Sequence, residues 1–393
     1  MAADPTDFTV DPDLPEGEEP GQRLPGPPRA DAIRHDGDSV MGAVLAEALS
    51  FTGRAERATH GFHTYPAGMH PDAARVVIAA CPGPVHDPFC GGGTVLVEAV
   101  LAGRRASGTD LSPVATLVTT ARTSGPEMAT PMRSAARKLA ERARARFPTV
   151  VPEVCREWYE PHVADELGRL RDGILEQDEA VRPLLFALLS SIAIKASFRE
   201  SDTSNRRKGG HRPPGTTAIL FHKKARELGR QLDEMPAERN VRVRLDDARS
   251  CGPPRGAGLV MTSPPYPGVY DYLPMQQLRY AWLGIEPPGR AFSAEVGSRR
   301  GFRAKGRAEA FRDWRDDTDR WVAAQASTLR SGGALVINVG DGLVGGRTVD
   351  ALSSTVESLR RAGLEVEARA SADRPDHARG AIRIEHMVLG RKP

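Results

Sequence analysis

The stretch PVHDPFCGGGTVLVEAVLAGRRASGTDLSPVA, residues 84–115, decides the fold of this chain. A predicted strand ends at Asp87, and residues 90–94 turn sharply into an apolar helix over residues 95–101. A second predicted strand ends at Asp110. Glycines let the backbone approach a ligand closely, and a helix N-terminus faces that ligand. An acid about twenty residues after the first strand end suits a ribose diol. The spacing therefore predicts a site for a nucleotide-like cofactor.

Two details of this stretch narrow the ligand. The glycines are contiguous (91–93), whereas dinucleotide folds space them as GxGxxG. Asp87 would repel a pyrophosphate but suits a cationic sulfonium–amino acid. DPFCGGGT resembles motif I of the amino-group DNA methyltransferases, which use S-adenosylmethionine. The resemblance implies cofactor contacts from Asp87, Pro88, Phe89, Cys90, Gly91, Gly93, Thr94 and Asp110. A glycine-rich turn without a ligand is the alternative interpretation.

Residues 60–71, HGFHTYPAGMHP, precede a predicted helix over residues 72–80. They resemble the HxYPA segment that stands before motif I in some cytosine-N4 methyltransferases. There the segment closes one side of the cofactor pocket, which implies a cofactor contact from Tyr65. The segment contains three histidines, but no carboxylate or cysteine lies near them at ligand spacing. We therefore expect no metal site.

A second motif, TSPPY, follows the apolar strand predicted at residues 258–261. It matches the (D/N/S)PP(Y/F/W) motif of enzymes that methylate exocyclic amines. An aryl amine attacks poorly because its lone pair is delocalised, so acceptors for its N–H groups assist methyl transfer. By resemblance, the Ser263 hydroxyl and the Pro264 carbonyl are those acceptors, and Tyr266 stacks on an extruded base. The implied catalytic residues are Ser263, Pro264, Pro265 and Tyr266. Transfer is direct, without a covalent intermediate on Cys90.

The remaining α/β pattern predicts the rest of the sheet. A strand at residues 241–245 ends near Asp247, which we place at the adenine end of the cofactor. Residues 334–339 form a buried strand, and two final strands suggest a closing hairpin. Together with the two motifs, this pattern predicts an α/β fold with a Rossmann-like, seven-stranded class I methyltransferase sheet. A helical insertion interrupts it, with helices over residues 132–147, 163–174, 184–196 and 221–235.

The predicted organisation has four parts. Residues 1–35 form a disordered acidic tail, since they are rich in Pro, Gly and acids and have few large apolar residues. Residues 36–119 form the cofactor half of the core. Residues 120–236 form the helical insertion, a candidate for substrate recognition. Residues 237–393 contain the catalytic loop and the C-terminal strands.

The charge distribution suggests a polyanionic partner. The net charge is +3, but residues 1–20 contain seven acids and no Lys or Arg. The rest of the chain has 54 basic against 44 acidic residues, a charge of +10. Two basic loops, 197–214 and 297–307, can contact phosphates, although solvated loops are the alternative. The candidate nucleic-acid-binding residues are Arg199, Arg206, Arg207, Lys208, Arg212, Arg299, Arg300, Arg303 and Lys305.

Several classes of protein do not fit the composition. The four cysteines (Cys81, Cys90, Cys155 and Cys251) show no CxxC or CxxH pairing, so we expect neither a zinc ribbon nor a disulfide framework. No apolar run reaches the length of a bilayer span, and no secretory signal begins the chain. We expect a cytoplasmic protein with reduced thiols. The sequence does not indicate its oligomeric state.

The motifs together predict an S-adenosylmethionine-dependent DNA methyltransferase of the amino type. Ser263 favours cytosine N4 as the acceptor. The alternatives are adenine N6 or RNA as acceptor, a small-amine N-methyltransferase, and a catalytically idle nucleic-acid-binding protein. The long insertion and the short region after TSPPY leave restriction-type specificity open.

Overall fold

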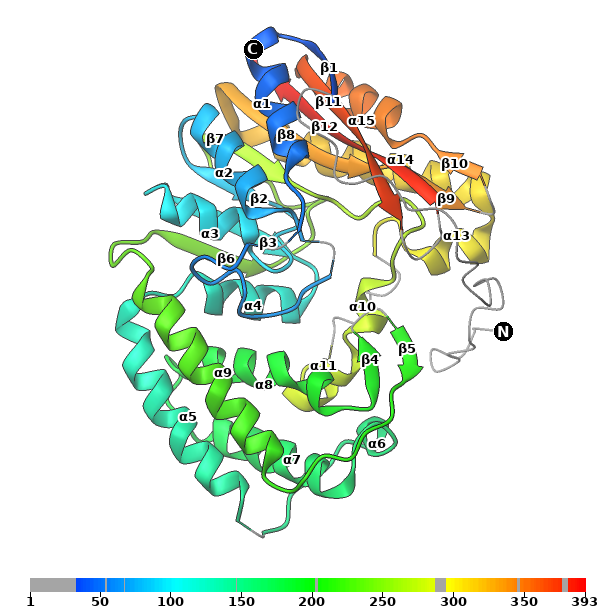
Figure 1. The fold of residues 1–393 in the computed structure, drawn as a ribbon. Coiled ribbons are helices and arrows are strands. Elements are labelled where there is room, and N and C mark those ends of the chain that lie inside the picture. The colour runs from blue at the N-terminus through cyan, green and yellow to red at the C-terminus, as the bar shows by residue number, and fades with distance from the viewer. Residues whose placement is uncertain are drawn as a thin grey trace.

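An eight-stranded sheet forms the centre of the computed structural model (Figure 1). The structure describes residues 33–393 except 54, 67, 146, 202–203, 287–294, 345–346 and 377–380. Most of the predicted acidic tail, residues 1–32, thus lies outside the described residues. In sheet order the strands are β1 (Arg34–Gly37), β11 (Glu365–Asp376), β12 (Ala381–Arg391), β8 (Leu329–Gly340), β7 (Ala257–Thr262), β2 (Val85–Asp87), β3 (Ala106–Asp110) and β6 (Val241–Leu245).

The pairing of the strands confirms the predicted fold class. The five strands from β6 to β8 are mutually parallel, while β12 and β11 close the sheet as an antiparallel hairpin. Counted along the chain without β1, the order is 3-2-1-4-5-7-6. This is the Rossmann-like, seven-stranded class I methyltransferase sheet with an added edge strand. The chain order reverses between β2 and β7, and ligands of open α/β sheets bind outside the carboxyl ends at such a point.

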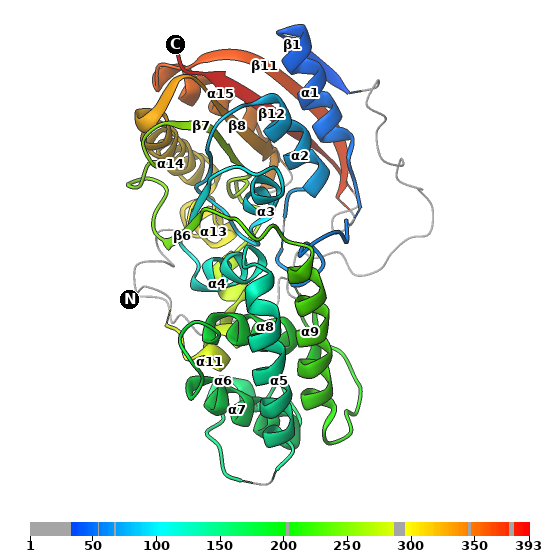
Figure 2. The same cartoon turned by 90° about the vertical axis from the view of Figure 1, so that its left-hand side faces the viewer.

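Helices cover both faces of the sheet, as the two side views show (Figures 1 and 2). On β7, Leu259 and Met261 belong to one hydrophobic cluster, while the intervening Val260 belongs to the other. This period of two is that of a strand buried on both faces. One face carries α1 (Ser39–Ser50), α2 (Pro71–Ala80), α3 (Thr94–Leu101) and α4 (Pro113–Arg122). The other carries α13 (Arg299–Lys305), α14 (Arg307–Thr328) and α15 (Ala351–Arg361).

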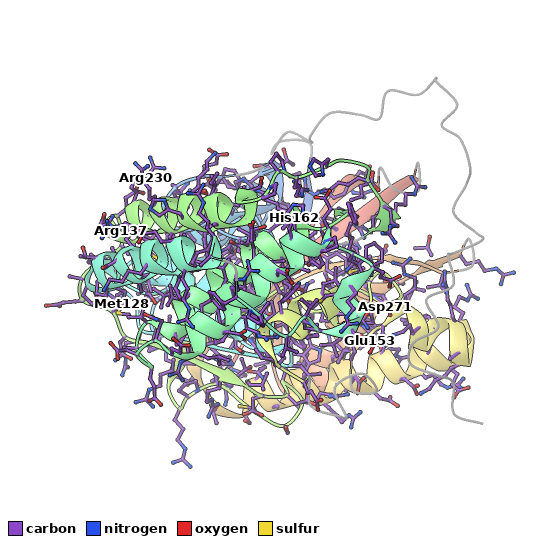
Figure 3. The ribbon with its side chains drawn as sticks, turned by 90° about the horizontal axis from the view of Figure 1, so that it is seen from below. Met128, Arg137, Glu153, His162, Arg230 and Asp271 are labelled. Atoms are coloured by element: carbon purple, nitrogen blue, oxygen red, sulfur yellow. The ribbon has the colours of Figure 1, made fainter. Side chains whose placement is uncertain are left out.

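The predicted helical insertion forms a separate bundle below the sheet (Figure 1). Its elements are η2 (Pro126–Met128), α5 (Ala129–Ala143), α6 (Glu153–Arg156), α7 (Pro161–Leu175), α8 (Arg182–Ala196) and α9 (Thr216–Asp233). The α8 helix is apolar nearly all round and packs against α4, α7, α9 and α11, which explains its buried leucines and isoleucines. The four predicted helices are confirmed. Figure 3 shows Arg137 of α5 and Arg230 of α9, both exposed, on the outer side of the bundle.

The segment after the TSPPY motif crosses from the sheet to the bundle. It contains α10 (Tyr272–Met275) and α11 (Gln277–Leu283), and α11 packs against α6, α7 and α8. Trp282 of α11 meets Tyr159 edge to face, with ring centres 5.5 Å apart. The bundle therefore includes residues that the predicted boundaries assign to the second half of the core.

Several elements differ from the sequence-based expectation. Strand β1 begins at Arg34, inside the segment predicted as tail, because it pairs with β11 along the sheet edge. Two short hairpins were not predicted: β4 (Arg199–Ser201) with β5 (Ser204–Arg207), and β9 (Gly342–Val344) with β10 (Arg347–Val349). Within the described part of the chain, no helix is both long and apolar enough to cross a membrane.

Candidate active site

The glycine-rich turn lies between β2 and α3, at the carboxyl edge of the sheet. Gly91 and Gly93 have φ values of 49° and 82°, in the left-handed region that favours glycine. A Cβ atom on Gly93 would lie 2.8 Å from the Thr119 hydroxyl. The Tyr65 ring packs over the turn, since a Cβ atom on Gly91 would lie 3.3 Å from that ring. The Tyr65 segment thus lies against the glycine-rich turn, and its contact with a cofactor stays a prediction.

Asp110 joins the end of β3 to this turn. Its two carboxylate oxygens accept hydrogen bonds from the backbone N–H of Gly91 (2.9 Å) and of Ser112 (2.8 Å). Burial raises the pKa of Asp110 to about 6, although these hydrogen bonds oppose the rise. The carboxylate is therefore positioned by backbone groups of two loops and lines a cavity.

Asp87 joins the turn to the TSPPY loop. Its Oδ1 atom accepts two hydrogen bonds, one from the Thr262 hydroxyl (2.7 Å) and one from the backbone N–H of Phe89 (3.1 Å). The side chain is buried, and burial raises the pKa of Asp87 to about 7. Because Thr262 ends β7, this contact sets the DPF turn beside the TSPPY motif.

Arg122, which the sequence-based analysis missed, ties the same turn to the Tyr65 segment. Its buried guanidinium donates to the carbonyls of Gly92 (2.6 Å), His60 (2.7 Å) and His63 (2.7 Å). The Thr59 hydroxyl donates to the Arg122 carbonyl (2.8 Å). Burial lowers the pKa of Arg122 to about 10, so the guanidinium stays charged at neutral pH. Nothing in the local sequence distinguishes it from the exposed arginines nearby.

A first cavity of about 950 Å³, including its open mouth, lies outside the carboxyl ends of β2, β3, β6 and β7. Of the predicted cofactor residues, only Gly93 does not line it, because Gly93 caps α3. The predicted residues along its wall are Tyr65, Asp87, Pro88, Phe89, Cys90, Gly91, Thr94, Asp110 and Asp247. Five acidic and no basic side chains line this cavity among the described residues. Its charge favours a cation.

Two acids of this wall have further partners. The Asp247 carboxylate pairs with Arg249 (2.6 Å), which also pairs with Asp317 (3.0 Å). Asp247 is thus held by a salt bridge at the edge of the cavity. Glu295, which the sequence-based analysis missed, accepts from the backbone N–H of Tyr272 (2.5 Å) and pairs with Arg300 (2.8 Å). Burial raises the pKa of Glu295 to about 7.

A second cavity, of about 1830 Å³ with its mouth, adjoins the first. Both are lined by Ser263, and they also share Tyr65, Gly68, Met69, Thr94 and Tyr272. Pro265 lines the first cavity, and its carbonyl accepts from the Trp314 indole N–H (3.3 Å). Pro264 is buried and lines neither. Ser263 therefore lies where two chambers meet.

Tyr266 lines only the second cavity, and its neighbours hold it closely. Its hydroxyl donates to Glu385 (3.2 Å), and the Asn338 side-chain amide lies 3.4 Å from the same oxygen. The Arg383 guanidinium lies over the ring, 5.5 Å from its centre. Gly340 approaches the ring so closely that a Cβ atom there would lie 2.6 Å from it. A base could stack on the face beneath Arg383 only if this guanidinium moved.

The three histidines before motif I have structural roles. His60 bonds to Glu98 (2.6 Å), His63 to the Ser190 hydroxyl (2.9 Å), and His70 accepts from the backbone N–H of Asp72 at the start of α2 (3.2 Å). Among the residues that the structure describes, no three His, Cys, Asp or Glu side chains group as metal ligands.

Several predicted nucleic-acid-binding residues instead hold the protein together. Arg199 is 5% exposed and donates to the carbonyls of Ser204 (2.8 Å) and Met275 (3.1 Å). Arg212 donates to the Ala196 carbonyl (2.9 Å), and Arg300 pairs with Glu295 as described above. These arginines fasten loops because buried carbonyls and carboxylates need donors. Each of these arginines thus has a partner within the protein, and a phosphate-binding role for them stays a prediction.

The other predicted basic residues are more accessible. Arg207 is exposed, but its guanidinium lies over the rings of Trp158 (5.3 Å) and Phe198 (5.4 Å). Lys305 pairs with Asp313 at the surface (2.5 Å). Arg206 and Arg303 are exposed, whereas Lys208 and Arg299 are partly buried. A phosphate-binding role for these six residues stays a prediction.

No family model matches the chain, and no curated protein matches its sequence. Among solved structures, TrmN from Thermus thermophilus aligns with 83% of this chain at 11% identity and a TM-score of 0.30. The chain covers 48% of TrmN, about half its length. A SAM-dependent methyltransferase from Methanosarcina mazei aligns over 84% of this chain and 98% of its own, at 9% identity and a TM-score of 0.33. The rRNA methyltransferase AviRa from Streptomyces viridochromogenes aligns over 84% and 88%, at 13% identity and a TM-score of 0.31.

The Arg122 contacts predict a large loss of stability on substitution. A hydrogen bond from a charged donor contributes about 1.5–3 kcal/mol, and Arg122→Met removes three. We expect the free energy of unfolding to fall by at least about 3 kcal/mol in denaturant titrations. Arg137→Met, at an exposed position of α5, should change it by less than about 0.5 kcal/mol. Equal stability of the two variants would contradict the role assigned to Arg122.

Proposed function

We propose that the first cavity binds S-adenosylmethionine. It lies at the point where the strand order reverses, and a glycine-rich turn and a helix N-terminus face it. Its acidic wall opposes a pyrophosphate but suits a ligand with a sulfonium and an ammonium group. Asp110, fixed by two backbone N–H groups, retains free lone pairs for the ribose hydroxyls.

We further propose that the protein methylates an exocyclic amino group in DNA, with cytosine N4 as the favoured acceptor. One observation carries this proposal: Ser263 of the TSPPY motif lines both cavities at once. A group held in the second cavity can therefore meet a ligand of the first cavity beside the Ser263 hydroxyl. The second cavity is the larger of the two, and tyrosines from several segments line it.

The residues at the junction can promote direct transfer. The bound cofactor would supply an electrophilic methyl group. Ser263 would accept a hydrogen bond from the acceptor amine, which gains positive charge as the new C–N bond forms. Tyr65 and Tyr272 line both cavities, so they would orient the two reactants and exclude water. As the C–N bond forms, the methyl–sulfur bond of the cofactor would break, its electron pair would stay on the sulfur of the departing thioether, and the amine proton would pass to solvent.

The alternatives differ in acceptor and in class. RNA or adenine N6 could present the same amine to Ser263. A small-amine N-methyltransferase would not need the exposed cations Arg206 and Arg303. A catalytically idle nucleic-acid-binding protein would not need the junction between the two cavities. Incubation with labelled cofactor and separate pools of DNA, RNA and metabolites discriminates all of these.

Substitution of Asp110 tests the cofactor site. Loss of a carboxylate that accepts from a buried hydroxyl costs about 1.5–3 kcal/mol. Asp110→Ala should therefore weaken S-adenosylmethionine binding about tenfold or more in calorimetry. Asp36→Ala, which removes an exposed ion pair on β1, should leave the affinity unchanged. The assignment fails if both variants bind the cofactor as the wild type does.

The raised pKa values predict a pH dependence. Asp87 and Asp110 have pKa values of about 7 and about 6, so both are partly protonated near pH 6.5. A cationic ligand favours their ionised forms, so its affinity should rise from pH 6 to pH 8, with protons released on binding. For the protein without ligand, stability changes with pH in the opposite direction to ligand affinity. Burial favours the protonated carboxyl, so the free energy of unfolding should fall as the pH rises from about 4 through about 7.

Calorimetry in two buffers of different ionisation enthalpy measures this proton release. Asp87→Asn should reduce the number of protons released, because the amide does not titrate. Binding of S-adenosylmethionine without proton release at pH 6.5 would contradict the ionised carboxylates proposed here.

Substitution of Ser263 tests the catalytic proposal. An acceptor that acts mainly in the transition state changes the rate and not the ground-state affinity. Ser263→Ala should lower the single-turnover methyl-transfer rate about 100-fold, the usual effect of losing one such polar contact. Cofactor affinity should stay nearly unchanged, and the exposed control Ser331→Ala should retain full activity. Wild-type transfer by Ser263→Ala would show that the mechanism is wrong.

A further inference from the structure

The wall of the second cavity contains buried polar groups that lack partners. Asn338, near the end of β8, is 8% exposed, and its Oδ1 atom has no hydrogen-bond partner among the described residues. The same holds for Nε of Arg383 on β12 and for Nη1 of Arg374 on β11. All three residues line this cavity. Because buried polar atoms are nearly always paired, such a group of orphans indicates that a ligand completes the site.

Arg383 has the most unused hydrogen-bonding capacity of the three. No carboxylate within the described part of the chain forms an ion pair with it, although Glu385 is only two positions away. The Glu385 carboxylate already accepts from Arg374 (2.8 Å) and from the Tyr266 hydroxyl (3.2 Å). The Arg383 guanidinium instead lies over the Tyr266 ring. It is half-buried, charged and available to a ligand.

Asn338 and Arg383 offer a specific pattern of donors and acceptors. A side-chain amide presents one donor and one acceptor side by side, which complements an amino group next to a ring nitrogen. An arginine adds a donor for a neighbouring carbonyl oxygen. Cytosine has all three groups along one edge: the N4 amine, N3 and the O2 carbonyl. Adenine has the amine and N1, but a C–H group follows where cytosine has its carbonyl.

We propose that Asn338 and Arg383 recognise the acceptor base and select cytosine over adenine. This inference rests on the proposed function, since it requires an amine presented to Ser263 of the same cavity. Asn338 bonds to the edge that contains N4 and N3, and Arg383 donates to O2. Tyr266 then serves as the platform on which the Arg383 guanidinium lies. This role differs from the stacking on an extruded base that the motif alone suggests.

A contact with a backbone phosphate is the competing role for Arg383. A phosphate remains largely in solvent, at the mouth of a cavity. Burial of the Arg383 Nε atom and of Asn338 beside the same tyrosine favours a ligand that enters the cavity. The two roles also differ in their consequences. Loss of a base contact relaxes specificity, whereas loss of a phosphate contact weakens binding to all sequences and flattens its salt dependence.

The test compares two DNAs that differ only at the O2 position. One is copied with ordinary deoxycytidine triphosphate and the other with the 2-thio analogue, in which sulfur, a weak acceptor, replaces O2. Mass spectrometry of digested nucleosides gives the rate of N4 methylation on each DNA, whatever the recognition sequence. The wild-type protein should methylate the thio-DNA at least about fivefold more slowly, as expected for loss of one base contact.

Substitution of Arg383 should abolish this difference. We expect Arg383→Met to methylate ordinary DNA at least about fivefold more slowly than the wild type, and both DNAs at similar rates. The ratio of the two rates is insensitive to any misfolded fraction of the variant. Arg369→Met, at an exposed position on β11 paired with Asp36, should keep the wild-type ratio. Asn338→Asp, which lacks the amide donor, should raise KM for ordinary DNA more than it lowers kcat.

Each other outcome contradicts the proposal. If Arg383→Met keeps the wild-type ratio while its binding is less salt-dependent by about one unit of log–log slope, Arg383 contacts a phosphate. If the wild type methylates both DNAs at the same rate, the protein makes no hydrogen bond to cytosine O2. If the wild type transfers methyl groups to adenine, RNA or a small amine but never to cytosine, the cytosine acceptor is wrong, and recognition by Arg383 fails with it.

Discussion

The hydrogen bond from the Thr262 hydroxyl to Asp87 is the contact on which the site depends. It joins two positions 175 residues apart in the chain, at the adjacent ends of β7 and β2. The glycine-rich turn begins at Asp87 and the TSPPY loop begins at Thr262. The parallel pairing of β2 with β7 places the turn and the loop side by side, and this bond ties their first residues together at one edge of the cavity. The Arg122 guanidinium joins the Tyr65 segment to the same glycine-rich turn, because it donates hydrogen bonds to carbonyls of both.

Much of this arrangement is predictable because each strand of a parallel sheet ends in a recognisable local signal. Apolar runs followed by Asp87, Asp110 and TSPPY identify the strand ends, and parallel strands bring their carboxyl ends to one edge. The helices of the insertion are likewise visible from their apolar periodicity. Strand β1 is not, because RHDG has no strand pattern of its own and forms only by pairing with β11.

The partners of charged side chains are not predictable in this way. Arg199 and Arg206 stand in one basic run, yet Arg199 is buried against two carbonyls and Arg206 is exposed. The difference arises from the β4–β5 hairpin and from α10. This helix lies more than 70 residues later in the chain, and its Met275 carbonyl accepts from Arg199. The sequence gives the residue type and its charge. Only tertiary contacts decide whether an arginine holds a loop or faces a ligand.

The buried carboxylates of the first cavity link the stability of the fold to the charge of whatever enters the cavity. Asp87, Asp110 and Glu295 line one cavity, and burial raises the pKa of each into the range of about 6 to 7. Without a cation, ionisation of these groups opposes folding, so selection for stability alone would favour apolar replacements. A bound cation would offset that cost, and the same carboxylates would then contribute to its affinity. The same reasoning applies to Asn338 and Arg383, because a buried polar atom without a hydrogen-bond partner costs free energy that a ligand would recover.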